Sequence, residues 1–336
     1  MLVKIMFGWI VFTVVVGLMK WIMGGLWTPY LVIEAVGLML FFGTVLYFYR
    51  VAMRWYTRDA EMERHVSDPS QAGLAFESFC VQRASGVQIE GWYIPETAGP
   101  VPCRKAVIYS HGFGNSREVC GEVTYRQMAA LHKAGYAIFT FDYPYGDRPH
   151  SHPMTAGIEE SRDLLAVVDY VRSRAYAWVA VFGYSFGGGT ALLAAQSGGV
   201  NALFLDSAFI AQLSLLIDML KRFAGLPPLL SRILLPPFWK HYIGIGWRDH
   251  PMNTILNHTF SIPMLIAHGT QDADAPYAVM ATFAQHQSPW GTFLSVSQGK
   301  HMELHEVLGE DGYNATILQW LSEVLQSSEK PAIQGG

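Results

Sequence analysis

The stretch Gly183-Tyr184-Ser185-Phe186-Gly187 decides how this chain is expected to fold. It follows the apolar run 178–182 and precedes a pattern of small residues that continues to Ala195. A strand that runs directly into a helix through Gly-x-Ser-x-Gly is the setting of a nucleophile elbow. The serine of such a turn takes a strained backbone conformation, and only glycines at 183 and 187 leave room for the adjoining backbones. The pattern therefore predicts that the hydroxyl of Ser185 stands clear of the sheet as a nucleophile.

A serine nucleophile needs a base and an orienting acid, and later segments supply both. Asp272 ends the segment His268-Gly269-Thr270-Gln271-Asp272, and His301 ends Gly299-Lys300-His301. A hydroxyl becomes reactive when a neutral imidazole accepts its proton, and a buried carboxylate holds that imidazole in one tautomer. We therefore expect Ser185 as the nucleophile, His301 as the general base and Asp272 as the orienting acid.

These assignments have rivals that the sequence leaves open. Asp206, just after an expected strand, and Asp274, two residues beyond Asp272, are alternatives for the acid. His305, one helical turn past His301, is the alternative for the base. Three further polar residues at strand ends are expected to shape loops rather than to react: His111, Asp142 and His268.

A second glycine-rich loop, His111-Gly112-Phe113-Gly114-Asn115, follows the first expected parallel strand. Its glycines allow the backbone amide of Phe113 to face the nucleophile. The amide of Phe186 lies at the N-terminus of the helix after the serine, where an anion is stabilised. We expect these two amides to form an oxyanion hole, because losing one such donor costs on the order of 100- to 1,000-fold in rate.

Short apolar segments alternate with helical segments from residue 106 onward, which predicts an α/β fold with a parallel sheet flanked by helices. Before them, 76–82 and 87–94 alternate apolar and polar residues about Ala84-Ser85-Gly86 and predict an antiparallel hairpin. Ligands of such a sheet bind at the carboxyl ends of its parallel strands. The expected parallel strands are 106–109, 136–141, 178–182, 202–205, 262–267 and 293–296.

The motifs HGxG at 111–114, GxSxG at 183–187 and HGxxD at 268–272 together resemble the α/β-hydrolase family, in particular its membrane-anchored or peptidase-like serine hydrolases. The resemblance covers residues 76–326. It implies the α/β-hydrolase fold, with a mostly parallel central sheet, and the roles given above to the serine, histidine, aspartate and two amides. It also implies a cap in the apolar insertion 209–261, whose side chains suit either packing on the sheet or an acyl-chain pocket.

The N-terminal region has the composition of a membrane anchor. Apolar residues make up 51% of the chain and charged residues only 15%, which indicates that part of the chain faces lipid. The stretches 5–27 and 30–49 are each near the ~20 residues that cross a bilayer as a helix, and they predict a transmembrane hairpin within 1–58. Arginines follow the second stretch, so both flanks, and with them the folded domain, are expected in the cytoplasm. They are Arg50, Arg54, Arg58 and Arg64.

The remaining composition excludes several classes of partner. The formal net charge is −4 with interspersed signs, and no Lys/Arg-rich run would follow a phosphate backbone, so nucleic acid is not expected. The three cysteines lack zinc-site spacing, which predicts no metal site and ordinary buried or half-buried thiols. Residues 59–75 read as a polar linker and 327–336 as a disordered tail.

Together these features predict a membrane-anchored serine hydrolase that cleaves carboxylic esters, lipid acyl esters or thioesters among them, through an acyl-enzyme without a cofactor. The expected partners are a small-molecule or lipid ester and the bilayer. A serine peptidase or aminopeptidase of the same fold is the alternative within the class. A non-catalytic membrane scaffold with a hydrolase fold is the alternative outside it.

Overall fold

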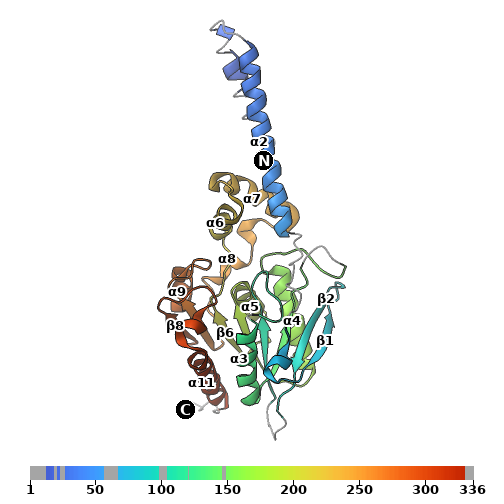
Figure 1. Cartoon of the computed structure of the whole chain (residues 1–336), viewed down its shortest axis with the longest axis vertical. Coiled ribbons are helices and arrows are strands. Elements are labelled where there is room, and N and C mark those ends of the chain that lie inside the picture. The colour runs from blue at the N-terminus through green and yellow to red at the C-terminus, as the bar shows by residue number, and fades with distance from the viewer. Residues whose placement is uncertain are drawn as a thin grey trace, which may run out of the picture. The chain divides into compact units, whose positions relative to one another are not determined.

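The computed structural model of this protein describes residues 13–18, 21–22, 27–56, 67–97, 104–119, 121–145 and 149–329 (Figure 1). The chain divides into two compact units. The anchor unit joins Met1–Trp55 to Leu213–His250, and the sheet unit joins Tyr56–Gln212 to Pro251–Gly336. Residues 59–66 of the expected linker and 330–336 of the expected tail lie outside the described residues.

Within the described residues, the sheet unit holds an eight-stranded sheet in the order β1-β2-β4-β3-β5-β6-β7-β8 (Figure 1). β1 pairs antiparallel with β2, and β2 with β4, while the other pairs are parallel. The predicted opening hairpin and the mostly parallel sheet are therefore confirmed. The strands are β1 Glu77–Gln82, β2 Gln88–Ile94, β3 Lys105–Ser110, β4 Ala137–Phe141, β5 Trp178–Tyr184, β6 Ala202–Asp206, β7 Met264–Gly269 and β8 Gly291–Val296.

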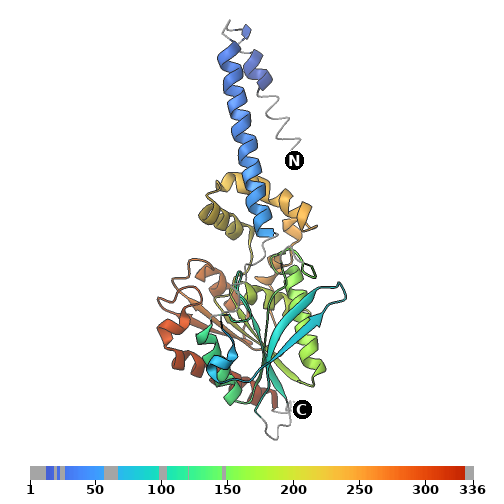
Figure 2. The ribbon, with the colours of Figure 1, turned by 45° about the vertical axis from the view of Figure 1, so that its right-hand side comes forward.

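Helices cover both faces of this sheet (Figure 2). Val107 of β3 belongs to a core with Met128 of α3 and Leu321 of α11, while its neighbour Ile108 points the other way and is equally buried. Strands buried on both faces are expected between two helical layers, which is why their sequences read as continuous apolar runs. The helices of this unit are η1 Pro69–Ala72, α3 Glu122–Lys133, α4 Ile158–Ser173, α5 Phe186–Gln196, α8 Met252–Ile255, α9 Tyr277–Gln285, α10 Leu304–Leu308 and α11 Glu310–Glu329.

The chain changes direction across the sheet at β3. β4 pairs on one side of β3, whereas β5 pairs on the other side and leads on to β6, β7 and β8. Ser110, the last residue of β3, is in register with Gly183 of β5. The loop after β3 and the turn after β5 therefore lie side by side at the switch point, where open α/β sheets bind their ligands.

Some expectations from the sequence are wrong in detail. β7 begins at Met264 rather than at 262, because Pro263 has no N–H to donate to the ladder. α11 extends to Glu329, so the expected disorder from 327 begins too early. Cys80, expected to be buried or half-buried, is exposed, because it lies on the outward face of β1 at the edge of the sheet.

The anchor unit joins a long N-terminal helix to the helices of the insertion. They are α2 Trp27–Tyr56, α6 Leu213–Ala224, α7 Pro228–Tyr242 and the short η2 Trp247–Asp249. Trp239 of α7 packs edge to face against Trp247, with ring centroids 4.7 Å apart, and both rings are buried. The apolar residues of the insertion thus form a small core within this unit.

One candidate membrane span occurs among the described residues. It covers Glu34–Arg54 within α2, at a mean hydropathy of 1.6. α2 is longer at both ends than the expected stretch 30–49. Of the other expected span, 5–27, only 13–18, 21–22 and Trp27 are described; the first two pieces are helical, and Trp27 is the first residue of α2. The described part of the chain therefore contains one candidate span, whereas the sequence predicted a hairpin of two.

Candidate active site

Ser185 occupies the sharp turn between β5 and α5, with φ 50° and ψ −120°. A positive φ is sparsely populated for residues other than glycine, so the surroundings must hold it. The amide of Ser185 donates to the carbonyl of Asp206 over 3.0 Å, and its carbonyl accepts from the amides of Phe209 at 2.8 Å and Gly188 at 2.9 Å. The predicted strained elbow is confirmed.

The glycines on either side of Ser185 are required by space. A Cβ at Gly187 would lie 2.1 Å from the carbonyl oxygen of Ser110, and one at Gly183 would lie 2.6 Å from Cα of Gly188. Neither contact is possible without a shift of the backbone. The expected need for glycine at both positions is confirmed, and the first contact also joins the elbow to the end of β3.

The three predicted triad residues lie in one hydrogen-bonded chain. Nε2 of His301 is 2.8 Å from Oγ of Ser185, and Nδ1 of His301 is 2.8 Å from Oδ2 of Asp272. Because Nδ1–H donates to the carboxylate, Nε2 is left to accept the proton of the serine. The side chain of Asp272 is fully buried and that of His301 is 18% exposed, so solvent reaches the ring but not the carboxylate.

The carboxylate of Asp272 is held by its own loop. Its Oδ1 accepts hydrogen bonds from the amides of Asp274 at 2.9 Å and Ala275 at 2.8 Å. His268 donates from Nε2 to the carbonyl of Ala275 over 2.8 Å, and the same nitrogen lies 3.3 Å from Oδ2 of Asp272. These contacts fix the carboxylate so that Oδ2 faces His301.

Burial lowers the pKa of both histidines, and nearby carboxylates raise it. Burial alone would lower the pKa of His301, but the hydrogen bond and charge of Asp272, helped by the charges of Asp274 and Asp206, raise this pKa above its ordinary value. At His268 burial dominates and lowers the pKa. His268 therefore stays neutral and braces the acid loop, as expected, while His301 is the more basic ring.

The loop after β3 packs directly on Ser185. A Cβ at Gly112 would lie 3.3 Å from Cβ of Ser185. The ring of Phe113 meets that of Phe186 edge to face, with centroids 6.3 Å apart. The two residues whose amides are expected to bind an oxyanion are thus neighbours, and Phe186 is the first residue of α5.

Two polar pairs brace this loop. Arg117 donates to Asp142 from its amide and from Nε, each over 2.6 Å. His111 accepts at Nε2 from the amide of Tyr143 over 3.1 Å, and its Nδ1–H donates to the carbonyl of Gly112 over 2.8 Å. One ring nitrogen accepts and the other donates, so the ring of His111 is neutral. The structural roles expected for His111 and Asp142 are confirmed.

Comparison with known proteins assigns this chain to a family. Residues 107–328 match the family described as Alpha/beta hydrolase family. The chain belongs to this family. The esterase Pf2001 of Pyrococcus furiosus has a similar structure, with a TM-score of 0.57 and 20% identity over 77% of this chain and 94% of that chain. Est1E from Butyrivibrio proteoclasticus gives a TM-score of 0.55 and 19% identity, over 74% of this chain and 99% of that chain. The uncharacterized protein YfhR of Escherichia coli K12 is 22% identical over 246 residues, which are 71% of this chain and 78% of YfhR.

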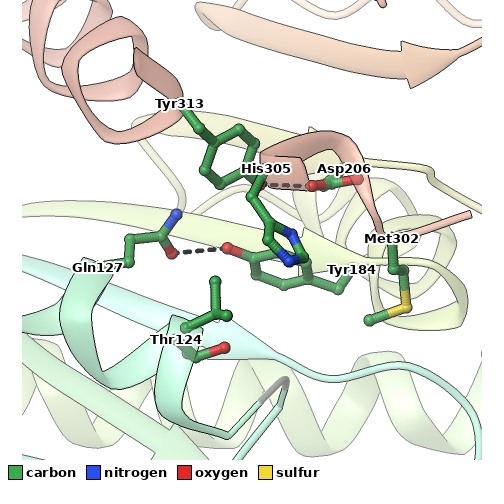
Figure 3. A pocket seen from close by; sticks show the side chains of 8 residues that line it. Thr124, Gln127, Tyr184, Asp206, Met302, His305 and Tyr313 are labelled. Atoms are coloured by element: carbon green, nitrogen blue, oxygen red, sulfur yellow. Dashed lines mark hydrogen bonds between the residues drawn. The ribbon is translucent and has the colours of Figure 1, made fainter. Parts of the chain in front are cut away.

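In this α/β hydrolase, the rival acid Asp206 and the rival base His305 make other contacts. Asp206 is buried at the end of β6, where Oδ2 accepts from the hydroxyl of Tyr313 and Oδ1 accepts from Oγ of Ser207 over 2.8 Å. Burial raises the pKa of Asp206 against the lowering effect of these two hydrogen bonds. His305 lines a small pocket with Asp206 and Tyr313 (Figure 3). Among the described residues, the side chain of neither rival is hydrogen-bonded to the side chain of His301 or Ser185.

Sequence reasoning missed a link from Asp206 to the backbone of the base. Ser207, at φ 52°, donates from Oγ to Asp206 and accepts at Oγ from the amide of Met302 over 3.0 Å. Met302 directly follows His301, so the end of β6 is tied to the turn that carries the base. An Asp-Ser pair after a strand is too common a pattern to have indicated this role.

Metal ligation has no candidate in the part of the chain that the structure describes. No group of three or more His, Cys, Asp or Glu side chains is placed there to hold a metal ion.

Proposed function

We propose that this protein is a serine hydrolase that cleaves carboxylic esters through an acyl-enzyme, with Ser185 as nucleophile, His301 as base and Asp272 as orienting acid. The observation that carries the proposal is the pair of 2.8 Å contacts from Ser185 through His301 to Asp272, set on a strained elbow. Such strain costs about 1 to 3 kcal/mol and is characteristic of functional sites. A non-catalytic scaffold protein would gain nothing from a strained backbone at Ser185.

In the acylation step, Nε2 of His301 accepts the proton of the Ser185 hydroxyl while Oγ attacks the carbonyl carbon of the ester. The carbonyl oxygen becomes an oxyanion, which the amides of Phe113 and Phe186 bind. Asp272 stabilises the imidazolium without taking its proton. His301 then gives the proton to the leaving alcohol as the C–O bond breaks, and the acyl group stays on Ser185.

Water completes the reaction by the same steps. His301 accepts a proton from water, the resulting hydroxide attacks the acyl carbon, and Oγ of Ser185 leaves with the proton that His301 returns. The carboxylic acid product is released in its ionised form. A raised pKa at His301 suits both steps, because the ring must accept and return a proton near neutral pH.

Esters rather than peptides are the substrates that we favour. Two proteins of similar fold are described as esterases, one from Pyrococcus furiosus and one from Exiguobacterium antarcticum. Each CH₂ of an acyl chain that is buried on binding would contribute about 0.8 kcal/mol. In a p-nitrophenyl ester series from acetate to palmitate, we expect the specificity constant to rise with chain length. A peptidase would prefer aminoacyl amides in parallel assays.

We also propose that α2 spans a membrane, with 5–27 as a second span and both chain ends in the cytoplasm. Support comes from the apolar span Glu34–Arg54 and from Arg50 and Arg54 at its end. Alkaline phosphatase fused after Gly336 should be inactive in cells, whereas a cytoplasmic reporter fused there should be active. The opposite result would reverse this orientation.

Labelling with a fluorophosphonate probe tests the catalytic proposal. The wild type should label and Ser185→Ala should not, because the probe needs an activated serine. Ser295→Ala is the matched control, since this serine on β8 is bonded to the hydroxyl of Tyr277 rather than to a base. A wild type that fails to label, or a Ser185→Ala variant that labels as strongly, would refute the proposal.

A further inference from the structure

The last turns of α2 pack against the insertion. Phe48 is fully buried, and its ring meets that of Phe238 on α7 edge to face, with centroids 6.1 Å apart. The ring of Tyr49 contacts Phe238 at 5.7 Å, and the hydroxyl of Tyr47 donates to the carbonyl of Ala224 at the end of α6 over 3.0 Å. Both views draw α6 and α7 beside this end of α2 (Figures 1 and 2). The insertion is therefore attached to the candidate membrane span.

This contact lies at one end of the span. Glu34–Arg54 has 21 residues and would measure about 31 Å as a helix, close to the ~30 Å hydrocarbon thickness of a bilayer. Tyr47 begins the contact, and Arg50 and Arg54 follow it, which is the order of an aromatic and basic boundary between hydrocarbon and headgroups. Placed across a bilayer, this span would hold the insertion at the level of the headgroups. Before the contact, α2 exposes apolar side chains that suit lipid: Val36, Met39, Leu40, Phe42 and Leu46.

α7 exposes apolar side chains next to basic ones. Leu229 is 72% exposed and Ile233 is 39% exposed, and their spacing of four residues places them on one face of the helix. Arg232 is exposed beside Ile233, and Lys240 is exposed near the end of the helix. Exposed apolar side chains beside basic ones are typical of a helix that lies in a bilayer interface.

Charge is strongly segregated between the two units. The anchor unit carries nine Lys and Arg against three Asp and Glu, whereas the sheet unit carries fourteen against twenty-four. Their formal charges are therefore +6 and −10, although the whole chain has −4. Residues 213–250 alone carry five basic side chains and two acidic ones. Anionic headgroups attract the first unit and repel the second.

We propose that residues 213–250 form a membrane-surface module that binds anionic phospholipid. α2 holds the module at the headgroups, Leu229 and Ile233 enter the interface, and the basic side chains contact the lipid phosphates. A bilayer is the occupant because the surface is continuous with the helix that would cross it. The chain directly after α2 is a poorer candidate, since its arginines alternate with Asp59, Glu61 and Glu63. The inference rests on the proposed span of α2.

Depth-dependent quenching tests this placement. Full-length protein with its three cysteines replaced by serine is reconstituted into vesicles, and an environment-sensitive fluorophore is attached through Leu229→Cys. The control carries the fluorophore through Val307→Cys, a position 48% exposed on α10 of the sheet unit. Nitroxide lipids labelled near the headgroup should quench the first site several-fold more than the second. Equal quenching at the two sites, strong or absent, would overturn the proposal.

The lipid charge supplies a second readout. Adding phosphatidylglycerol to phosphatidylcholine vesicles should increase quenching at the Leu229→Cys site. The double variant Arg232→Glu with Lys240→Glu should lose this increase, whereas Lys133→Glu, an exposed charge reversal on α3, should keep it. An increase that survives the double variant would contradict binding of anionic lipid by the insertion.

Two controls separate failure of this inference from failure of the proposed function. Alkaline carbonate extraction reports on the anchor, because a protein without a membrane span leaves the pellet. Fluorophosphonate labelling of each variant reports on the folded sheet unit and on Ser185. A protein that stays in the membrane and labels normally, yet shows no selective quenching at the Leu229→Cys site, would refute the inference alone.

Discussion

The contacts inside the sheet unit differ in kind from the contacts inside the anchor unit. Around Ser185, glycines bring backbones together and directed hydrogen bonds orient the polar groups, such as the pair from Arg117 to Asp142. In the anchor unit, rings such as Phe238 pack edge to face, and the buried indole nitrogen of Trp239 has no hydrogen-bond partner among the described residues. Directed contacts fix positions closely, whereas apolar packing tolerates change. Directed contacts therefore suit the chemistry proposed for the sheet unit, and apolar packing suits the lipid-facing surface proposed for the anchor unit.

The largest expected effect distinguishes two carboxylates at neighbouring strand ends. Asp272→Asn should lower kcat by about 10,000-fold, because an amide stabilises the wrong tautomer of the base. Asp206→Asn should cost far less, since Asp206 contacts Tyr313 and Ser207 rather than His301. Steady-state hydrolysis of a p-nitrophenyl ester measures both. Equal losses would restore Asp206 as a candidate for the acid.

Two glycine substitutions test the comparison of the units directly. Gly187→Ala drives a Cβ into the carbonyl of Ser110, so we expect about a 100-fold loss of activity or more from the displaced elbow. A Cβ at Gly43 in α2 meets no atom of the described residues within 4 Å, and Gly43→Ala improves helix propensity, so activity should be unchanged. The turnover number and melting temperature of both variants show whether the elbow tolerates substitution less than α2 does. A harmless Gly187→Ala would show that the elbow is as tolerant as α2.

A buried ion pair makes the stability of the sheet unit depend on pH. Nε2 of His152 lies 2.6 Å from Oδ2 of Asp163, and its Nδ1 lies 2.8 Å from the carbonyl of Pro153. Both partners are acceptors, so the ring donates from both nitrogens and is charged. Burial would lower the pKa of His152, but the hydrogen bond and charge of Asp163, with the charge of Glu160, raise it to about 9.

The folded pKa of His152 is above its unfolded value, so this stabilisation is complete below about pH 6.5 and is lost as pH rises through about 9. The loss amounts to at most about 3 kcal/mol. Melting temperatures across this window should fall in the wild type and fall less in His152→Gln. His241→Gln, at an exposed position on α7, should follow the wild type. Parallel curves for all three proteins would contradict a charged His152.

The smallest expected effect is a shift of a pH profile. Catalysis needs neutral His301, so kcat/KM should fall on the acid side with an apparent pKa above the ordinary histidine value. Asp274 raises the pKa of His301 by its charge alone, because its contact with Asp272 uses the backbone amide. Asp274→Asn should therefore move the acid limb to lower pH and leave the plateau unchanged. A shift to higher pH would contradict this electrostatic assignment.

Local sequence patterns predict the sheet unit well because short segments of sequence determine its strands and its sharp turn. Gly183 and Gly187 indicate a turn that has room only for glycine, and the apolar runs before this turn indicate strands that are buried on both faces. The sequence alone does not identify the acid that orients His301. Asp206 ends β6, and Asp272 lies three residues after the end of β7. What distinguishes them is the hydrogen bond of His301 to Asp272, which depends on the fold of two loops.

The anchor unit could not be derived in the same way. Apolar residues at 209–261 indicate burial but carry no information about the partner, since one apolar helix face suits many others. The contacts of Phe48 and Tyr49 with Phe238 join segments that no local pattern connects. Cys80 illustrates the same limit, because its exposure follows from the position of β1 at the sheet edge and not from its own neighbours.

The hydrogen bond from Tyr47 to the carbonyl of Ala224 joins residues that are 177 positions apart. A ribosome that adds 5 to 20 residues per second needs about 9 to 35 s to make the chain between them. α2 is therefore synthesised well before α6 and α7, and β1 through β6 are made in the interval. During that time the ring of Phe48 has its neighbour Tyr49 but lacks Phe238, so this side of α2 is open to lipid or to a chaperone. The unit that contains the first helix to be made is thus completed only after six strands of the other unit have been synthesised.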